Sequence, residues 1–138
     1  MALPTLMTFD AFTAAEKEGW DARASGYAKH TSLATTQIVP ALLDALAICP
    51  GQRLLDVACG PGNVACAAAA LDLNAEGIDC APAMITAAKA RFPDLTFREA
   101  DAEDLPFDDA MFDVVACNMG LFHMADPARA MAEAVRVL

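Results

Sequence analysis

One segment, LLDVACGPGNVA at residues 54–65, limits the fold of this chain more than any other. A short apolar run leads into Gly60-Pro61-Gly62, and the helix-forming run NVACAAAALDL begins at residue 63. Glycines let a ligand approach the backbone closely, and the first turn of a helix presents free N–H groups to that ligand. The segment therefore predicts a buried strand, a ligand-binding turn and a helix, although a turn without a ligand has the same pattern.

Strand and helix patterns alternate along the rest of the chain. The strand patterns lie at residues 53–58, 74–80, 95–101 and 112–119, and the helix patterns at residues 63–73, 81–92 and 126–138. This alternation predicts parallel β-α-β crossovers and hence an α/β fold. Residues 1–50 have only helical spacing, with breaks predicted at Gly19 and Gly26, and Pro50-Gly51 ends this segment. We expect one domain, with a helical cap at 1–50 and a core at 51–138.

Charge and cysteine content argue against several kinds of partner. The 138 residues carry a formal net charge of −10, which repels the phosphates of nucleic acids and of anionic membranes. No apolar run approaches the length of about 18 residues that a membrane-spanning helix needs, and MALPTLMTFD lacks the basic start of a signal peptide. The five cysteines include no CxxC pair. We therefore expect a cytoplasmic protein with reduced thiols, no membrane insertion, no nucleic-acid partner and no metal site.

Acidic residues at the strand ends narrow the choice of ligand. Gly60-x-Gly62-x-x-Ala65, followed by Asp79, formally fits the dinucleotide-binding fingerprint. Asp56, however, would repel a pyrophosphate and would favour a ligand that carries an ammonium or sulfonium group. Asp79 can accept hydrogen bonds from both hydroxyls of a ribose, or it can cap the helix that follows.

Two further positions are compatible with an adenine ring. Asp101 ends the third strand pattern and can accept a hydrogen bond from an adenine amino group, while the Ala102 N–H donates to a ring nitrogen. The Met84 thioether can pack on an adenine face or within the core. A solvated acidic loop is the alternative for Asp101, and it is the expected environment of Glu103, Asp104, Asp108 and Asp109.

Four segments, in this order, resemble the class I S-adenosylmethionine-dependent methyltransferases: LLDVACGPG, GIDCAPAMITAAKAR, READAEDLPF and FDVVACNMGLFHMADPARAMAEAVRVL. The chain is most similar to the small-molecule branch, which includes quinone-biosynthesis and related C-, N- and O-methyltransferases, over about residues 20–138. The resemblance implies a Rossmann-like parallel sheet in the order 3-2-1-4 with helices on both faces. Strands 5–7 of the family are absent from this sequence. The fourth strand would then be an edge that can pair with a second copy, so we expect a homodimer or a piece of a longer chain.

The resemblance also implies a cofactor site for S-adenosylmethionine, with S-adenosylhomocysteine as product and a small-molecule methyl acceptor. Its expected members are Asp56, Ala58, Cys59, Gly60, Pro61, Gly62, Asp79, Cys80, Met84, Asp101, Ala102, Asn118 and Met119. An N-terminal helix closes over the site in many relatives, which adds Tyr27 to the site and also directs attention to Trp20 and His30. Ala58 stands where the family usually has the first glycine of the loop.

The sequence indicates the cofactor more clearly than it indicates the reaction. His123, just after the fourth strand pattern, is the candidate base, although a histidine that only packs or caps a loop is an alternative. Asn118-Met119-Gly120-Leu121 lacks the prolines of the Asn-Pro-Pro-aromatic motif, which argues against DNA methylation. Two other functions stay open: a module or fragment that binds the cofactor without catalysis, and a nicotinamide dinucleotide oxidoreductase supported only by the glycine spacing.

Overall fold

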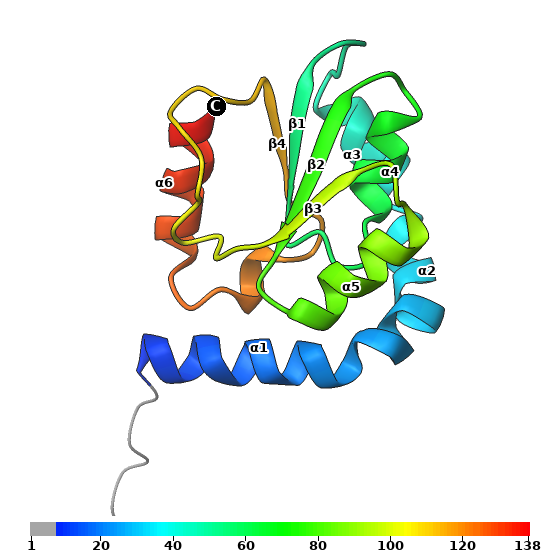
Figure 1. The fold of residues 1–138 in the computed structure, drawn as a ribbon. Helices are drawn as coiled ribbons and strands as arrows, with labels where there is room; N and C mark the ends of the chain where they lie inside the picture. Colours follow the sequence, from blue (N-terminus) through cyan, green and yellow to red (C-terminus); the bar gives the residue numbers. More distant parts are fainter. Residues whose placement is uncertain (1–7) are drawn as a thin grey trace, which may run out of the picture.

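A four-stranded parallel sheet forms the centre of the structure, a computed structural model that describes residues 8–138 (Figure 1). The strands are β1 (Arg53–Val57), β2 (Asn74–Asp79), β3 (Thr96–Glu99) and β4 (Val114–Ala116). Their order in the sheet is β3-β2-β1-β4, which confirms the predicted α/β fold and strand order. In this register Asp56 of β1 lies between Gly77 of β2 and Ala116 of β4, so its side chain starts from the middle of the sheet.

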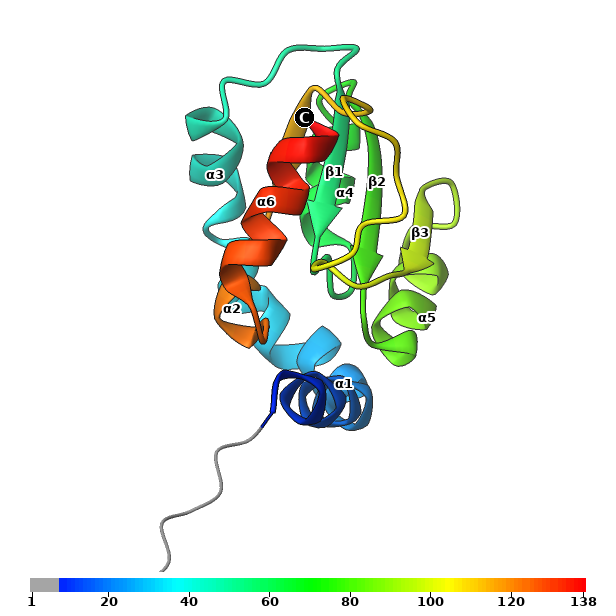
Figure 2. The ribbon, with the colours of Figure 1, turned by 90° about the vertical axis from the view of Figure 1, so that its left-hand side faces the viewer.

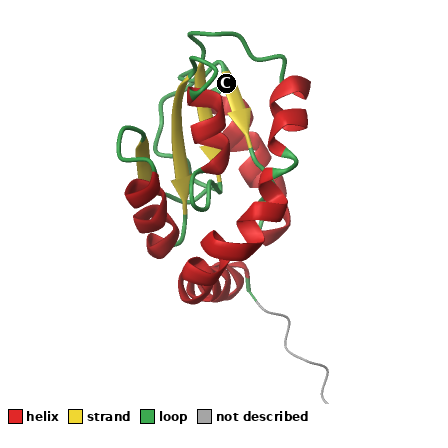
Figure 3. Cartoon of the chain, turned by 90° about the vertical axis from the view of Figure 1, so that its right-hand side faces the viewer, coloured by secondary structure: helices red, strands yellow, loops and turns green. Residues whose placement is uncertain are grey.

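Helices cover both faces of the sheet (Figures 1 and 3). The helices are α1 (Phe9–Gly26), the π-helix η1 (Tyr27–Thr31), α2 (Ser32–Thr36), α3 (Val39–Ala45), α4 (Asn63–Ala69), α5 (Pro82–Arg91), the 3₁₀-helix η2 (Leu121–His123) and α6 (Pro127–Val137). Helix α6 packs on one face, and α3, α4 and α5 lie on the other. None of the helices within residues 8–138 is long and apolar enough to cross a membrane.

The two faces of the sheet carry separate apolar cores. Leu54 is fully buried among Val39, Leu43 and Val64, on the side of α3 and α4. Its neighbour Leu55 is fully buried on the opposite side, with Val137 of α6. Successive strand residues point to opposite faces, so two adjacent buried leucines require cover on both sides.

Helix α1 lies across the carboxyl ends of the strands (Figures 1 and 2). Lys17 forms an ion pair with Glu99 at the end of β3. Asp21 Oδ1 accepts a hydrogen bond from the Ala83 N–H, at 2.7 Å, in the first turn of α5. These contacts place the amino-terminal helix over the end of the sheet where ligands bind in open α/β folds.

The predicted helical character of residues 1–50 is confirmed over its described part, but only one of the two glycine breaks occurs. Helix α1 ends at Gly26, where the π-helix begins. Gly19, in contrast, lies inside α1, so the break predicted there is wrong. Glycine costs only about 1 kcal/mol in a helix interior, and the Arg23 side chain folds back over this position to donate from Nε to the Gly19 carbonyl at 2.8 Å.

Candidate functional site

The loop after β1 bends by placing three residues in left-handed backbone conformations. The φ angles are 56° at Ala58, 52° at Gly60 and 85° at Gly62. Gly62 has a second reason to lack a side chain, because a Cβ atom there would lie 2.7 Å from Phe97 Cζ. The loop therefore packs tightly against the core on one side and presents its backbone to the pocket on the other.

Asp79 ties this loop to the end of β2. Its Oδ2 accepts a hydrogen bond from the Gly60 N–H at 2.9 Å, and its Oδ1 accepts from the Ala81 N–H at 2.9 Å. The side chain is buried, and burial raises the pKa of this carboxyl while the two N–H donors oppose the rise. The carboxylate thus fixes the loop and still borders the pocket, where it has unused acceptor capacity.

Asp56 lies beneath the loop rather than in the pocket. It is fully buried; Oδ2 accepts from the Ala65 N–H at 3.1 Å, and Oδ1 has no hydrogen-bond partner. Burial, followed by the nearby charge of Asp79, raises the pKa of Asp56 to about 7. The bond to the Ala65 N–H holds the first turn of α4. In this structure Asp56 therefore has a structural role, because it positions the loop and the helix.

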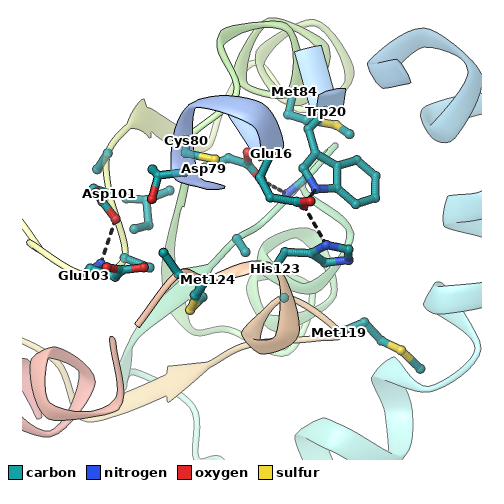
Figure 4. A pocket seen from close by; sticks show the side chains of 18 of the residues that line it. Glu16, Trp20, Asp79, Cys80, Met84, Asp101, Glu103, Met119, His123 and Met124 are labelled. Atoms are coloured by element: carbon teal, nitrogen blue, oxygen red, sulfur yellow. Dashed lines mark hydrogen bonds and ion pairs between the residues drawn. The ribbon is translucent and has the colours of Figure 1, made fainter. Parts of the chain in front are cut away.

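A pocket that is open to solvent lies between the loop, the strand ends and α1 (Figure 4). The predicted residues that line it are Tyr27, Ala58, Gly60, Asp79, Cys80, Met84, Asp101, Ala102, Asn118, Met119 and His123, together with Trp20. Asp56, Cys59, Pro61, Gly62 and His30 do not line it. The direct ligand contacts expected of the first four of these residues are therefore not visible in the pocket geometry. Met119 borders the pocket, but its side chain points away from the other labelled residues.

Carboxylates dominate the charge of this pocket. Glu16, Asp79, Asp101 and Glu103 line it, and none of the residues that the structure places in its wall is a lysine or an arginine. Burial and the neighbouring acids raise the pKa of Cys80 to about 11, so this thiol stays neutral near pH 7. Such a pocket favours a ligand that carries positive charge and disfavours a pyrophosphate.

The acidic loop after β3 is more ordered than the sequence suggested. Asp101 Oδ1 accepts from the Glu103 N–H at 2.9 Å, and Glu103 Oε1 accepts from the Asp126 N–H at 2.9 Å. Glu103 was expected to be solvated, and this prediction is wrong, because its side chain links the loop to the start of α6 and borders the pocket. Arg136 of α6 holds the next part of the loop by donating to the carbonyls of Leu105 and Phe107.

The opposite side of the pocket is made by α1, η1 and η2. The Tyr27 ring lies over the glycine loop, since a Cβ atom at Gly60 would lie 3.7 Å from its Cε1. Its hydroxyl is 3.3 Å from Thr35 Oγ1, and Asn118 Nδ2 donates to the Thr35 carbonyl at 3.1 Å. A π-helical turn begins at Tyr27, and such turns are frequent at functional sites.

Glu16, Trp20 and His123 form a connected group in the same wall (Figure 4). His123 Nδ1 lies 2.8 Å from Glu16 Oε2, and Trp20 Nε1 donates to the same oxygen at 3.1 Å. The sequence drew attention to Trp20 and His123 but gave no reason to connect His123 with Glu16. The i,i+4 spacing of Glu16 and Trp20 on a helix was the only available signal.

Ala58 and Gly120 share one small space. A Cβ atom at Gly120 would lie 2.6 Å from Ala58 Cβ and 2.9 Å from Cys117 Sγ. The methyl group at 58, in a position where glycine is common in the resembled family, is thus accommodated by the missing side chain at 120.

Comparison with known proteins gives consistent matches. The family described as "Methyltransferase domain" matches residues 55–138. Demethylmenaquinone methyltransferase of Renibacterium salmoninarum is 40% identical over 96 residues, which are 70% of this chain and 40% of that protein. The chain thus spans about two fifths of the length of the curated relatives it matches.

Two solved structures show the range of proteins with this fold. Phosphoethanolamine N-methyltransferase 2 of Haemonchus contortus, in complex with phosphomonomethylethanolamine and S-adenosylhomocysteine, has a TM-score of 0.69 and 27% identity, over 74% of this chain and 26% of that chain. The [4+2]-cyclase SpnF has a TM-score of 0.67 and 27% identity, over 75% of this chain and 40% of that one. The fold therefore carries more than one reaction.

Proposed function

This chain belongs to the methyltransferase family whose domain covers residues 55–138, a family that uses S-adenosylmethionine, and on that premise we propose that it transfers the methyl group of this cofactor to a small-molecule acceptor. S-adenosylhomocysteine is the product. The pocket between the glycine loop and α1 is the proposed site of the reaction.

The carboxylate lining of the pocket is the observation that carries this proposal. S-adenosylmethionine brings a sulfonium and an ammonium group, and the pocket lining supplies Glu16, Asp79, Asp101 and Glu103 without a described lysine or arginine. A nicotinamide dinucleotide would bring a pyrophosphate to the same place, where like charges repel it. The negative charge of the pocket lining therefore favours the sulfonium cofactor. It disfavours the dinucleotide, which the glycine spacing alone would also allow.

The polar groups also follow one another along the pocket in an order that matches the parts of S-adenosylmethionine. Asp79, already held by two backbone N–H groups, would accept from the ribose hydroxyls. Asp101 and the Ala102 N–H would read the edge of the adenine, beside Met84 and Cys80. Asn118 and Tyr27 would border the methionine end, where the aromatic ring of Tyr27 gains cation–π attraction from a sulfonium.

In methyl transfer the protein itself forms no covalent bond to the substrate. The bound cofactor supplies an electrophilic methyl group and a good leaving group. The chain's residues hold the donor and the acceptor in line, and α1 covers one side of the pocket with Glu16 and Trp20. The name of the curated relatives supports an aromatic, quinone-related acceptor. Pairing of the exposed β4 edge with a second copy stays a prediction, as does the cytoplasmic location.

Calorimetric titration of the 138-residue chain tests the cofactor site. We expect S-adenosylhomocysteine to bind and NADH not to bind. Asp79→Ala should weaken binding at least tenfold, and Asp104→Ala should leave it unchanged, because the Asp104 side chain is 84% exposed and lies outside the pocket. Binding of NADH, or no binding of S-adenosylhomocysteine by a folded chain, would refute the proposal.

A further inference from the structure

We propose that Glu16 and His123 form a proton-accepting pair, and that the methyl acceptor is a compound whose phenol-type hydroxyl loses its proton during transfer. This inference rests on the proposed function. His123 would take the proton, and Glu16 is the positioning residue that prepares the imidazole for it.

The pair joins two segments that lie far apart in the sequence. Glu16 is on α1 and His123 is on η2, yet Oε2 and Nδ1 are 2.8 Å apart. Their side chains are 25% and 34% exposed, so the contact is shielded but reachable from the pocket. Trp20 and Phe122 contact the imidazole from two directions, with ring centroids at 4.9 Å and 4.4 Å. The ring is therefore held in one orientation at the pocket wall.

The hydrogen bonds determine which ring nitrogen carries the proton. Trp20 Nε1 can only donate, so Glu16 Oε2 acts as an acceptor toward it. An ionised carboxylate accepts every hydrogen bond it makes, and the second bond to this oxygen therefore has Nδ1–H of His123 as its donor. With the proton on Nδ1, the neutral ring keeps its lone pair on Nε2. This nitrogen is the basic one, as in other carboxylate–histidine pairs.

Nε2 is also the nitrogen that is available to a ligand. No hydrogen bond joins it to any of the residues 8–138, and His123 lines the pocket. In Figure 4 the ring edge that bonds Glu16 faces α1, and the other ring nitrogen lies on the side away from Asp79 and Asp101. The ribose and adenine would lie near those two acids, so Nε2 is on the side left for the acceptor.

This placement suits an acceptor that must lose a proton to react. As the hydroxyl oxygen forms a bond to the methyl carbon, the bond between the methyl carbon and sulfur would break and sulfur would keep the electron pair. Where the activated ring carbon is methylated instead, that carbon would also lose its hydrogen as a proton, which makes the ring aromatic again. The O–H proton passes to Nε2, and the Glu16 carboxylate balances the charge of the resulting imidazolium. A neutral amine attacks through its free lone pair before it loses a proton, so it gains less from such a base.

Nitrogen-15 NMR of the histidine rings tests the pair directly. The chain has two histidines, and the exposed His30 serves as the internal reference. At pH 8 we expect His123 to carry its proton on Nδ1. Glu16→Ala should move that proton to Nε2, because Nδ1–H then loses its acceptor. The His30 signals should keep their wild-type chemical shifts. A wild-type His123 protonated on Nε2, or a tautomer unaffected by Glu16→Ala, would overturn the pair.

A turnover assay tests the substrate class, with 1,4-naphthohydroquinone and 1-naphthylamine as acceptors. We expect methylation of the hydroquinone, with kcat at saturating S-adenosylmethionine lowered about 10²-fold by Glu16→Gln. Glu18→Gln, at an exposed position on the same helix, is the matched control and should leave kcat unchanged. Preference for the amine, an unchanged kcat in Glu16→Gln, or no methylation by a chain that binds S-adenosylhomocysteine would overturn the inference. Failure to bind S-adenosylhomocysteine would instead refute the proposed function.

Discussion

The floor and the wall of the pocket are held together by different kinds of contact. The floor, residues 58–62 with Asp56 and Asp79, is fixed by backbone N–H groups that donate to buried carboxyl groups. The wall, formed by α1 and η2, buries Ala24 against Ala81 and Met84, and its polar contacts are made by side chains that remain partly exposed, such as the Lys17–Glu99 pair. Exposed ion pairs contribute little to stability, whereas buried carboxyl groups are costly to disturb. The floor should therefore be rigid, and the wall should open first.

The largest expected effect comes from the buried carboxyl beneath the floor. An acid with a higher pKa in the folded than in the unfolded state favours folding at low pH and loses that contribution as the pH rises. For Asp56 the pKa rises from 3.8 to about 7 on folding, so the loss extends from about pH 4 to pH 7 and is on the order of 4 kcal/mol. Asp56→Asn keeps an oxygen for the Ala65 N–H and removes the titration. We expect urea unfolding to show that, between pH 4 and pH 8, the free energy of unfolding of the wild type falls by about 4 kcal/mol more than that of the variant.

Asp104→Asn, at an exposed position, is the control for that comparison and should follow the wild-type profile. If the free energies of unfolding of wild type and Asp56→Asn depend on pH in the same way, ionisation of Asp56 does not destabilise the folded state. The stability of the floor would then come from other contacts.

The glycine loop offers the next largest effect. Gly62→Ala combines a left-handed φ of 85° with a Cβ atom 2.7 Å from Phe97 Cζ, and it should lower the free energy of unfolding by about 3 kcal/mol. Gly51 has nearly the same φ, 86°, but open space around it, so Gly51→Ala should cost about 1 kcal/mol. Chemical denaturation of both variants separates backbone strain from packing. Equal losses would mean that Phe97 moves aside and that the floor is less tightly packed than the distances indicate.

The wall variants should have the smallest effects, confined to α1. Asp21→Ala removes the acceptor for the Ala83 N–H and should cost about 1 kcal/mol, which raises hydrogen exchange of the α1 amides about fivefold. Lys17→Ala removes only an exposed ion pair and should cost less than about 0.5 kcal/mol. In both variants the Gly60 N–H, bonded to Asp79, should keep its protection. Faster exchange at Gly60 would show that floor and wall open together.

The floor could be predicted from the sequence to a greater extent than the wall. The floor is local in the chain: an apolar strand, a glycine turn and a helix follow one another within residues 54–65, and their chemistry identified the loop. Even so, the helix pattern at 63–73 extends too far, because α4 ends at Ala69 and Asp72 takes a left-handed φ of 62°. The fourth strand is also shorter than its apolar run, since β4 ends at Ala116.

The wall and the loop after β3 depend on contacts that no local pattern encodes. Glu16 and His123 are 107 residues apart, and Glu103 reaches the Asp126 N–H across 23 residues. Charged residues in a loop or on a helix usually face water, so their pairing requires knowledge of how α1 crosses the sheet. Asp56 shows the converse: its type and place suggested a ligand contact, and only its burial beneath the loop reveals the bond to Ala65.

The shared space between Ala58 and Gly120 makes the two positions depend on each other over evolutionary time. Gly120 has an ordinary φ of −94°, so an alanine there would meet no backbone strain, only the Ala58 methyl and the mobile end of Cys117. One side chain fits in the space and two do not. A lineage can therefore exchange the methyl group between the two positions through an intermediate with glycine at both, but not through one with alanine at both. A substitution at either position is neutral or harmful according to what the other already carries.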